Sequence, residues 1–213
     1  MTVDAVEFAS LLCSRLCHDL LSPVGALNNG IELLADETDP QMRQQCLDLL
    51  SDSARTTANK LKFFRLAFGA AGGFDDQVDA REAQIAIEGL FSTNKRIELG
   101  WMVAEPTLSK AAIKVLLNLV MIAGDTLVRG GRLDVGAEVH LGRTEIAVRA
   151  TGDRLILDDT IRATLSGNTA PADLAPRVAA AWMAHSIAQQ AGGNIQVSEP
   201  DQPFLLFGAT LGV

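Results

Sequence analysis

The sequence predicts an α+β protein in which an N-terminal antiparallel helical hairpin precedes a mixed layer of helices and strands. The 213-residue chain is 48% apolar and 21% charged, ordinary values for a folded protein, and its length allows one or two domains. A stretch rich in glycine and aspartate, residues 68–79, separates a helical pattern from a region in which strand-like and helix-like segments mix. We therefore expect a helical domain over residues 1–70 and a second domain over residues 74–213.

The N-terminal domain is expected to contain two long helices, over residues 4–35 and 40–67. The connecting segment DETDP places Asp39 as an N-cap and Pro40 in the first turn, where proline is well tolerated. Helices joined by so short a turn pack side by side in antiparallel directions.

Each of these helices carries an apolar stripe that is longer than one neighbouring helix covers. A single hairpin cannot bury both stripes, so we expect two copies to pair into a four-helix bundle, which makes the protein a homodimer. The stripe of the first helix consists of Ala9, Leu12, Leu16, Leu20, Pro23, Leu27, Ile31 and Leu34, and that of the second of Cys46, Leu49, Leu50, Ser53, Ala54, Thr57, Leu61, Phe64 and Phe68.

The second domain alternates between segments typical of strands and segments typical of helices. Strands are expected at residues 95–101, 132–140, 143–150, 194–198 and 203–213, and helices at 81–91, 108–127 and 174–190. Gly192 and Gly193 follow the last helix and are expected to end it. The pattern predicts a sheet that helices cover on one face.

Composition argues against several classes of protein. The chain has 18 Lys and Arg against 26 Asp and Glu, a net charge of −8, and a nucleic-acid binder needs a basic surface to displace counterions. The longest uncharged stretch, residues 178–198, contains His185 and the glycine pair, so we expect no membrane-spanning helix. The acidic N-terminus shows no signal peptide, and a cytoplasmic location is expected.

Three cysteines, Cys13, Cys17 and Cys46, are an odd and sparse set that fits free thiols in a reducing compartment. Together they could bind a metal ion. We expect instead that they are buried thiols that fill a helix interface, because free cysteine is often buried.

One histidine of the first helix lies opposite its apolar stripe. At about 100° per residue, His18 projects about 180° from the centre of that stripe, into solvent. A lone exposed histidine is usually a solvated residue without a role. Two neighbours argue against that here: Asp19 can orient or deprotonate the ring, and Pro23 interrupts the helix at a cost of about 3 kcal/mol. The surrounding face is mostly small or polar and would let another protein approach; it carries Leu11, Arg15, Ser22, Gly25 and Asn29.

Residues 18–23, HDLLSP, resemble the phosphoacceptor motif of sensor histidine kinases, a histidine followed by an acidic residue and, after two positions, by a small polar residue and proline. In that family the histidine accepts a phosphoryl group on a dimeric helical hairpin. An imidazole suits this role, because it is nucleophilic at neutral pH and its phosphoramidate can pass the group to a carboxylate. The resemblance implies that His18 is the nucleophile and that Asp19 orients its ring.

The second domain resembles the ATP-binding domain of the same kinases in layout, but its nucleotide motifs are degenerate. Asn118 of the asparagine motif is kept, whereas Ile122 replaces the second asparagine and Lys114 replaces the glutamate base of ATP-hydrolysing relatives. Ala150 stands where an aspartate should bind the adenine amine, and residues 168–176 lack the glycines of a phosphate-binding loop. We therefore expect that this chain binds no nucleotide or metal and has no autokinase activity.

As a whole, the chain resembles the ChpT-type histidine phosphotransferases of alphaproteobacteria, with the closest agreement over residues 11–30 and 68–72. The resemblance implies a cell-cycle phosphorelay in which the receiver of a CckA-type hybrid kinase phosphorylates His18, and regulators of the CtrA and CpdR types accept the group. Magnesium would then lie in the acidic pocket of the receiver. The receiver would dock on Arg15, Ser22, Gly25, Ala26 and Asn29.

Two other functions stay open on the sequence alone. An active sensor histidine kinase would bind ATP and phosphorylate itself in the absence of any receiver. A non-catalytic module that sequesters a receiver or a kinase would need no nucleophile at His18.

Overall fold

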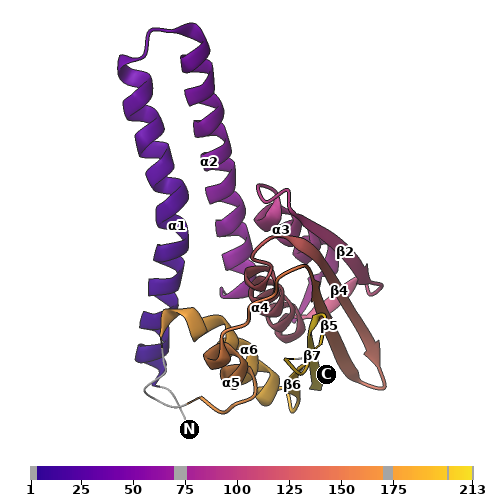
Figure 1. Cartoon of the computed structure of the whole chain (residues 1–213). Coiled ribbons are helices and arrows are strands. Elements are labelled where there is room, and N and C mark those ends of the chain that lie inside the picture. The colour runs from indigo at the N-terminus through magenta and orange to yellow at the C-terminus, as the bar shows by residue number, and fades with distance from the viewer. Residues whose placement is uncertain (1–3, 70–75, 170–174, 201, 213) are drawn as a thin grey trace.

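In the computed structural model, which describes residues 4–69, 76–169, 175–200 and 202–212, a long helical hairpin stands on an α+β layer (Figure 1). The hairpin consists of α1 (Ala5–Asp36) and α2 (Pro40–Ala67), and both predicted helices are confirmed to within one residue at each end. The start of α2 is fixed because the Asp39 carboxylate accepts hydrogen bonds from the backbone N–H groups of Gln41 (3.0 Å) and Met42 (2.9 Å).

The layer is built on strands whose bounds, within the described residues, are β1 (Gln77–Asp79), β2 (Ile97–Val103), β3 (Thr107–Ser109), β4 (Gly131–His140), β5 (Arg143–Thr151), β6 (Asn194–Val197) and β7 (Leu205–Gly212). Five of them form one sheet in the order β2–β4–β5–β7–β6. In this sheet β2 and β4 are parallel, and the other neighbouring strands are antiparallel. The short strands β1 and β3 form a separate antiparallel pair.

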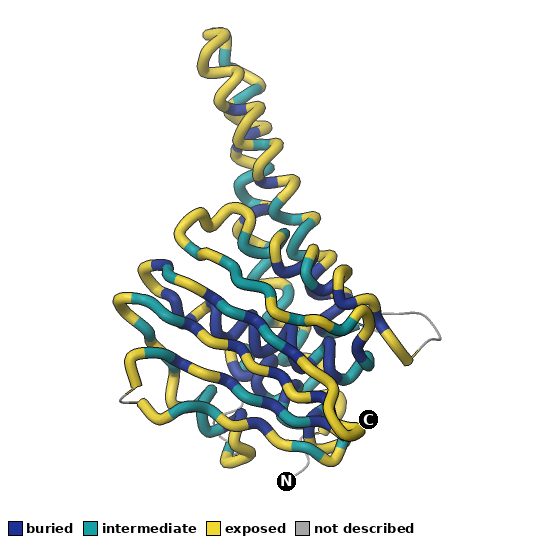
Figure 2. The backbone as a smooth tube through the Cα atoms, turned by 90° about the vertical axis from the view of Figure 1, so that its right-hand side faces the viewer, coloured by how far each residue is buried: buried dark blue, intermediate teal, exposed yellow. Residues whose placement is uncertain are grey.

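Helices cover one face of the five-stranded sheet, as predicted, and in Figure 2 they lie behind it. They are α3 (Ala80–Phe91), α4 (Lys110–Thr126), α5 (Asp159–Leu165) and α6 (Ala179–Gln190), and the short 3-10 helix η2 (Pro176–Val178) packs beside α1, α5 and α6. Along β5 buried and exposed residues alternate, so that one face of the strand packs on the helices and the other faces solvent. Most of α4 is buried, which makes it the centre of the core.

The structure departs from the predicted elements at short segments. β1, β3 and α5 were not predicted, because strands of three residues and a helix of seven are too short to show a periodicity. The helix predicted from residue 108 begins at Lys110, since β3 occupies the preceding residues and the Ser109 hydroxyl caps the helix by accepting from the N–H of Ala112. The strands predicted from residues 95 and 203 begin two residues later, and Val213 lies outside the described residues.

The last helix is also shorter than predicted at its start. It was expected over residues 174–190 but begins at Ala179, after η2, and residue 174 lies outside the described residues. Its end is as expected: Gly192 has a φ of 65°, in the left-handed region, and the N–H of Gly193 donates to the carbonyl of Ala188 over 2.8 Å.

The base of the hairpin is packed into the C-terminal layer. Phe63 near the end of α2 is fully buried in the common core. The ring of Phe8 on α1 lies 4.5 Å from that of Trp182 on α6, centroid to centroid. Arg65 on α2 pairs with Glu82 on α3 over 3.0 Å. The apolar contacts of Phe63 and Phe8 hold α1 and α2 in a fixed place relative to the sheet, and the exposed Arg65–Glu82 pair adds little to them.

No helix in the described part of the chain is both long and apolar enough to cross a membrane. Cys46 is buried as expected, whereas Cys13 and Cys17 are exposed, so the helices of a single chain do not bury these two thiols. Within residues 4–69, 76–169, 175–200 and 202–212, no group of three or more His, Cys, Asp and Glu side chains is placed to hold a metal ion.

Candidate functional site

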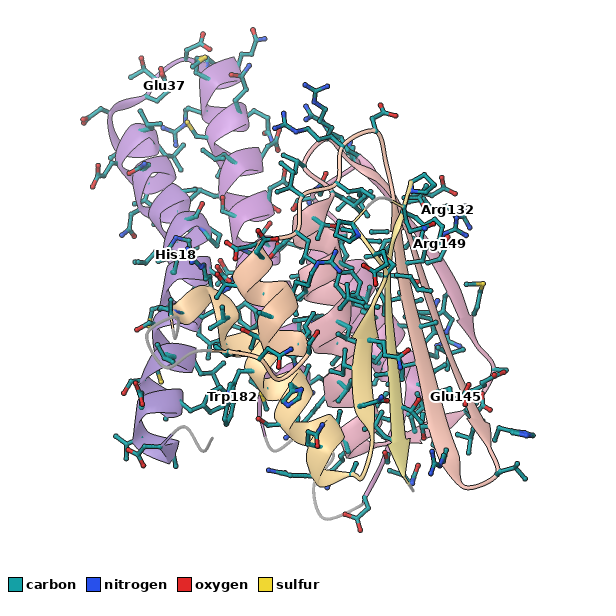
Figure 3. The ribbon with its side chains drawn as sticks, turned by 60° about the horizontal axis from the view of Figure 1, so that its bottom comes forward. His18, Glu37, Arg132, Glu145, Arg149 and Trp182 are labelled. Carbon is teal, nitrogen blue, oxygen red and sulfur yellow. The ribbon has the colours of Figure 1, made fainter. Side chains whose placement is uncertain are left out.

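His18 lies on the exposed side of α1, with 85% of its side chain accessible (Figure 3). Its ring Nδ1 is 3.2 Å from Oδ1 of Asp19. A carboxylate accepts hydrogen bonds and does not donate them, so this contact places the ring proton on Nδ1. The lone pair of Nε2 is then available on a ring that a second protein can reach. The exposed position expected for His18 from helical periodicity is the one observed.

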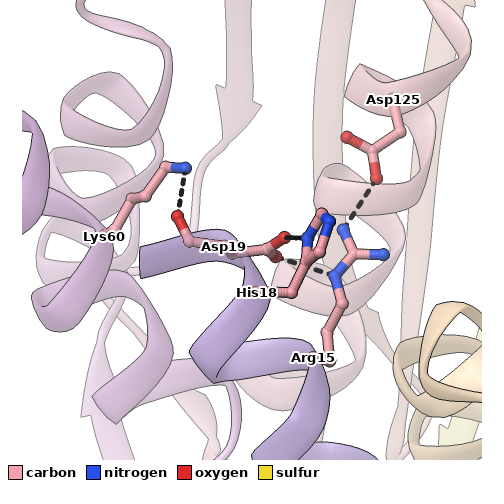
Figure 4. Close-up of polar contacts among 5 residues, drawn as sticks. All are labelled: Arg15, His18, Asp19, Lys60 and Asp125. Atoms are coloured by element: carbon pink, nitrogen blue, oxygen red, sulfur yellow. Dashed lines mark hydrogen bonds and ion pairs between the residues drawn. The ribbon is translucent and has the colours of Figure 1, made fainter. Parts of the chain in front are cut away.

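Asp19 is held by Arg15, which precedes it by one turn of α1. Only 17% of the Asp19 side chain is accessible, and Nε of Arg15 donates to its Oδ2 over 2.7 Å. A second nitrogen of the same guanidinium, Nη2, donates to Oδ2 of Asp125 on α4 over 3.0 Å (Figure 4). Desolvation alone would lower the pKa of Arg15, but the negative charges of Asp125 and Asp19 outweigh it and raise that pKa. The side chain of Arg15 therefore binds Asp19 within α1 and joins α1 to the C-terminal domain through Asp125.

Pro23 leaves a backbone acceptor free, and Lys60 of α2 uses it. In an α-helix the N–H of residue 23 would donate to the carbonyl of residue 19, but proline has no N–H. The carbonyl oxygen of Asp19 instead accepts a hydrogen bond from Nζ of Lys60 over 2.8 Å (Figure 4). The proline thus gives α2 a charged contact with the residue that binds His18.

We expect Lys60→Met to destabilise the protein by about 1–2 kcal/mol, because the partly buried Asp19 carbonyl loses its donor. In a Pro23→Ala background the same change should cost less, because the new backbone N–H at position 23 can bond to this carbonyl. Urea unfolding of the four proteins in a double-mutant cycle measures the difference. An equal cost of Lys60→Met in both backgrounds would contradict this role of Lys60.

The residues expected to form a docking surface do not all lie on the surface. Ser22 and Asn29 are exposed, and Gly25 and Ala26 are half-buried. Arg15 does not project into solvent as expected: only 18% of its side chain is accessible, and it binds two carboxylates. Periodicity along one helix could not show this, because the second carboxylate belongs to a residue 110 positions further along the chain.

Some residues of the site were missed at the level of sequence. Leu21 is 69% exposed and was not predicted as part of the docking surface, although helical periodicity places it about 60° from His18. Lys60 was foreseeable in part, since a proline in a helix always frees a carbonyl. No sequence signal pointed to Asp125, whose role depends on how the two domains pack.

The positions that bind the nucleotide in kinases do not fit a nucleotide here. Ala150 is fully buried on the inner face of β5, and Ile122 on α4 is 5% exposed. An apolar core offers no hydrogen-bonding group to a purine. Residues 168–176 were expected to lack a phosphate-binding loop. Five of them, 170–174, lie outside the described residues.

Asn118, the retained asparagine, is fully buried and has a structural contact. Its Nδ2 donates to the carbonyl oxygens of Lys114 (2.8 Å) and of Ala67 at the end of α2 (3.3 Å). Its Oδ1 is buried without a hydrogen-bond partner among the described residues, but those residues provide no cluster that would complete a metal site around it. Burial, and then the positive charge of Lys110, lowers the pKa of Lys114, the residue that stands in place of the glutamate base.

A helical hairpin that exposes a histidine bonded to an acidic neighbour, joined to an α+β layer, is the arrangement expected of a histidine phosphotransfer protein. The chain belongs to the histidine phosphotransferase family: residues 80–203 match the model of the histidine phosphotransferase C-terminal domain. Over 139 residues it is 41% identical to the protein phosphotransferase ChpT of Brucella abortus (strain 2308). That alignment covers 65% of this chain and 64% of the relative, which is less than two thirds of either. A solved bacterial phosphotransferase aligns with 98% of this chain and 98% of its own, at 31% identity and a TM-score of 0.85.

Proposed function

We propose that this chain is a phosphorelay intermediate in which His18 takes a phosphoryl group from the aspartyl phosphate of one receiver domain and passes it to the aspartate of another. The observation that carries the proposal is the exposed His18 ring whose Nδ1 lies 3.2 Å from a carboxylate oxygen of the largely buried Asp19. Both features are what a reversible phosphoacceptor needs: access for large partners, and a defined nucleophilic nitrogen.

The chemistry needs no further acid or base from this chain. The lone pair of Nε2 attacks phosphorus, the N–P bond forms, and the P–O bond to the donor aspartate breaks to release a carboxylate. Because Nδ1 keeps its proton, the phosphorylated ring carries a positive charge, which the Asp19 carboxylate 3.2 Å away stabilises. In the second half, the acceptor carboxylate attacks phosphorus, the N–P bond breaks, and Nε2 regains its lone pair.

The receiver would dock on the face of α1 around His18. Ser22 and Asn29 are exposed there, and an added Cβ at Gly25 would meet no atom within 4 Å among the described residues, so a partner can approach the backbone of Gly25 and Ala26 closely. Leu21 adds an exposed apolar contact to this surface. By resemblance to ChpT-type proteins, the donor is the receiver of a CckA-type hybrid kinase, and the acceptors are cell-cycle regulators of the CtrA and CpdR types.

In this proposal ATP binding is lost, and magnesium is supplied by the acidic pocket of the receiver. The buried, apolar side chains of Ala150 and Ile122 at the nucleotide positions support it. They weigh against the alternative of an active sensor kinase. The alternative of a module that merely sequesters a receiver gives no reason for the proton on Nδ1 to be held so specifically.

In the test, receiver domains encoded in the same genome are phosphorylated with labelled phosphate. The phosphate donor is then removed, and each labelled receiver is mixed with this protein. The proposal requires that label moves from one receiver to this chain and then to a second receiver. It fails if no receiver labels the chain, or if the chain labels itself from ATP alone.

We also propose that the active form is a homodimer, because each helix of the hairpin leaves an apolar stripe uncovered. On α2 the exposed stripe has a seven-residue spacing, as in helix bundles, and Figure 2 shows the hairpin largely exposed above the layer. These exposed residues differ from the predicted stripes, which lie partly between α1 and α2; they are Val6, Cys13, Cys17, Val24 and Ile31 on α1, and Leu47, Ala54 and Leu61 on α2. A second copy of the hairpin would cover both exposed sets, and helical periodicity places His18 about 120° from the exposed set of α1, outside the interface.

We expect Ile31→Glu to weaken the dimer by about a hundredfold or more, because a symmetric interface would bury two unpaired carboxylates. Leu33→Glu is the matched control: Leu33 is 60% exposed, like Ile31 at 59%, but lies on the opposite side of α1. Sedimentation over a range of protein concentrations measures both. A monomeric wild-type protein, or equal behaviour of the two variants, would contradict the proposed interface.

A further inference from the structure

The contact between Arg15 and Asp125 joins the phosphoacceptor helix to the C-terminal domain. Arg15 lies on α1, and Asp125 lies near the end of α4, 110 positions later. The guanidinium presents donors in a fixed fork, and two of them are used: Nε bonds to Asp19 over 2.7 Å and Nη2 to Asp125 over 3.0 Å. With 18% of its side chain accessible, Arg15 has little freedom to turn towards solvent.

Asp19 divides its two oxygens between two partners. Oδ1 contacts Nδ1 of His18, and Oδ2 accepts from Arg15 (Figure 4). The carboxylate is planar, so fixing Oδ2 also fixes the direction in which Oδ1 faces the ring. The strength with which Asp19 keeps the proton of His18 on Nδ1 therefore depends on how firmly Arg15 holds the Asp19 carboxylate.

Arg15 in turn is held by Asp125. A long arginine side chain on a helix surface samples many rotamers, and a second carboxylate selects the one in which Nε faces Asp19. The C-terminal domain brings Asp125 to this place because its junction with the hairpin is fixed by apolar packing, that of Phe8 on Trp182 among it.

We propose that Asp125 is a positioning residue for phosphotransfer: through Arg15 it orients Asp19 and so keeps Nε2 of His18 as the nucleophilic nitrogen. This inference rests on the proposed function of His18. It gives the C-terminal domain a task that needs no nucleotide, namely to complete the site on α1 from outside the hairpin.

The experiment compares full-length Asp125→Ala with wild type by 15N NMR of the histidine side chains at about pH 8, where an ordinary imidazole is neutral. Glu82→Ala is the matched control, because it removes another ion pair between the hairpin and the C-terminal domain, also 3.0 Å long, that does not touch Asp19. We expect Asp125→Ala to lower the ratio of the Nδ1–H to the Nε2–H tautomer of His18 by about two- to tenfold, as the loss of one hydrogen bond to a charged group would. Glu82→Ala should leave this ratio unchanged.

A second measurement follows phosphorylation of His18 by phosphoramidate, a small donor that needs no docking surface. In this reaction Nε2 attacks phosphorus, the P–N bond of the donor breaks and ammonia leaves. We expect the rate to fall in Asp125→Ala in proportion to the fraction of His18 in the Nδ1–H tautomer, which changes less than the ratio where this tautomer dominates. Asp125→Asn, which keeps an acceptor oxygen for Arg15, should restore part of the rate.

An unchanged tautomer ratio in Asp125→Ala would overturn the proposal. The proposal would also be overturned if Asp125→Ala changed only one quantity, the receiver concentration that gives the half-maximal rate of transfer. Asp125, whose side chain is 62% exposed, would then be a docking residue. The tautomer ratio is measured without any partner, so the two proposals can fail separately. If the wild-type protein took no label from receivers, the phosphorelay function would be overturned. The positioning role of Asp125 would then be judged on the tautomer ratio alone.

Discussion

His18→Ala is expected to abolish transfer of label from a phosphorylated receiver to this chain and onward to a second receiver. The reaction forms its covalent bond on Nε2, and alanine offers no nucleophile in its place. The fold should persist, because 85% of the His18 side chain is accessible and substitutions at such positions change stability by only about 0.5 kcal/mol or less. The measurement is the label retained on each protein after a brief mixing, with circular dichroism and sedimentation to confirm structure and assembly.

His140→Ala is the matched control for this experiment. His140 is the last residue of β4, is exposed like His18, and lies in the C-terminal layer away from α1. Its replacement should leave transfer at the wild-type level. Label that still reaches the second receiver through His18→Ala would rule out the phosphorelay mechanism and favour a different phosphoacceptor.

Sequence reasoning was sufficient for the parts of this molecule that depend on local patterns. Both helices of the hairpin were predicted because capping at Asp39 and a long apolar periodicity are properties of contiguous residues. The exposure of His18 follows from the same geometry of one helix, and its contact is with the next residue along the chain. The family resemblance then gave these residues a chemical meaning that periodicity alone could not give.

The parts that failed depend on contacts between distant residues. Arg15 was predicted on the open face of α1, but it is drawn into the junction by Asp125, and a helical projection contains no information about another domain. The short strands β1 and β3 exist because they pair with each other and not because either has a strong strand pattern. Cys13 and Cys17 were expected to be buried, and a single chain does not bury them.

We expect Ala150→Asp to destabilise the protein by more than about 3 kcal/mol, which lowers Tm by roughly 6–12 °C in a chain of this length. The change restores the side chain that binds adenine in kinases. In this chain, however, Ala150 is fully buried on β5 with Leu133 and Leu205 as its neighbours on the adjacent strands. A carboxylate there would lose its hydration without gaining a partner.

Ala147→Asp provides the matched comparison, since it makes the same substitution three residues earlier in the same strand. Ala147 faces solvent, and its neighbours on the adjacent strands are Gly136 and Gly208, which leave room for a larger side chain. We expect this variant to lose no more than about 1 kcal/mol. Thermal unfolding and titration with a nucleotide analogue measure both proteins. If Ala150→Asp were as stable as Ala147→Asp and bound the analogue, the nucleotide site would be intact except for one residue. Loss of stability without binding would mean that the former nucleotide site has become part of the core, so that restoring one motif residue cannot return the chain to kinase chemistry.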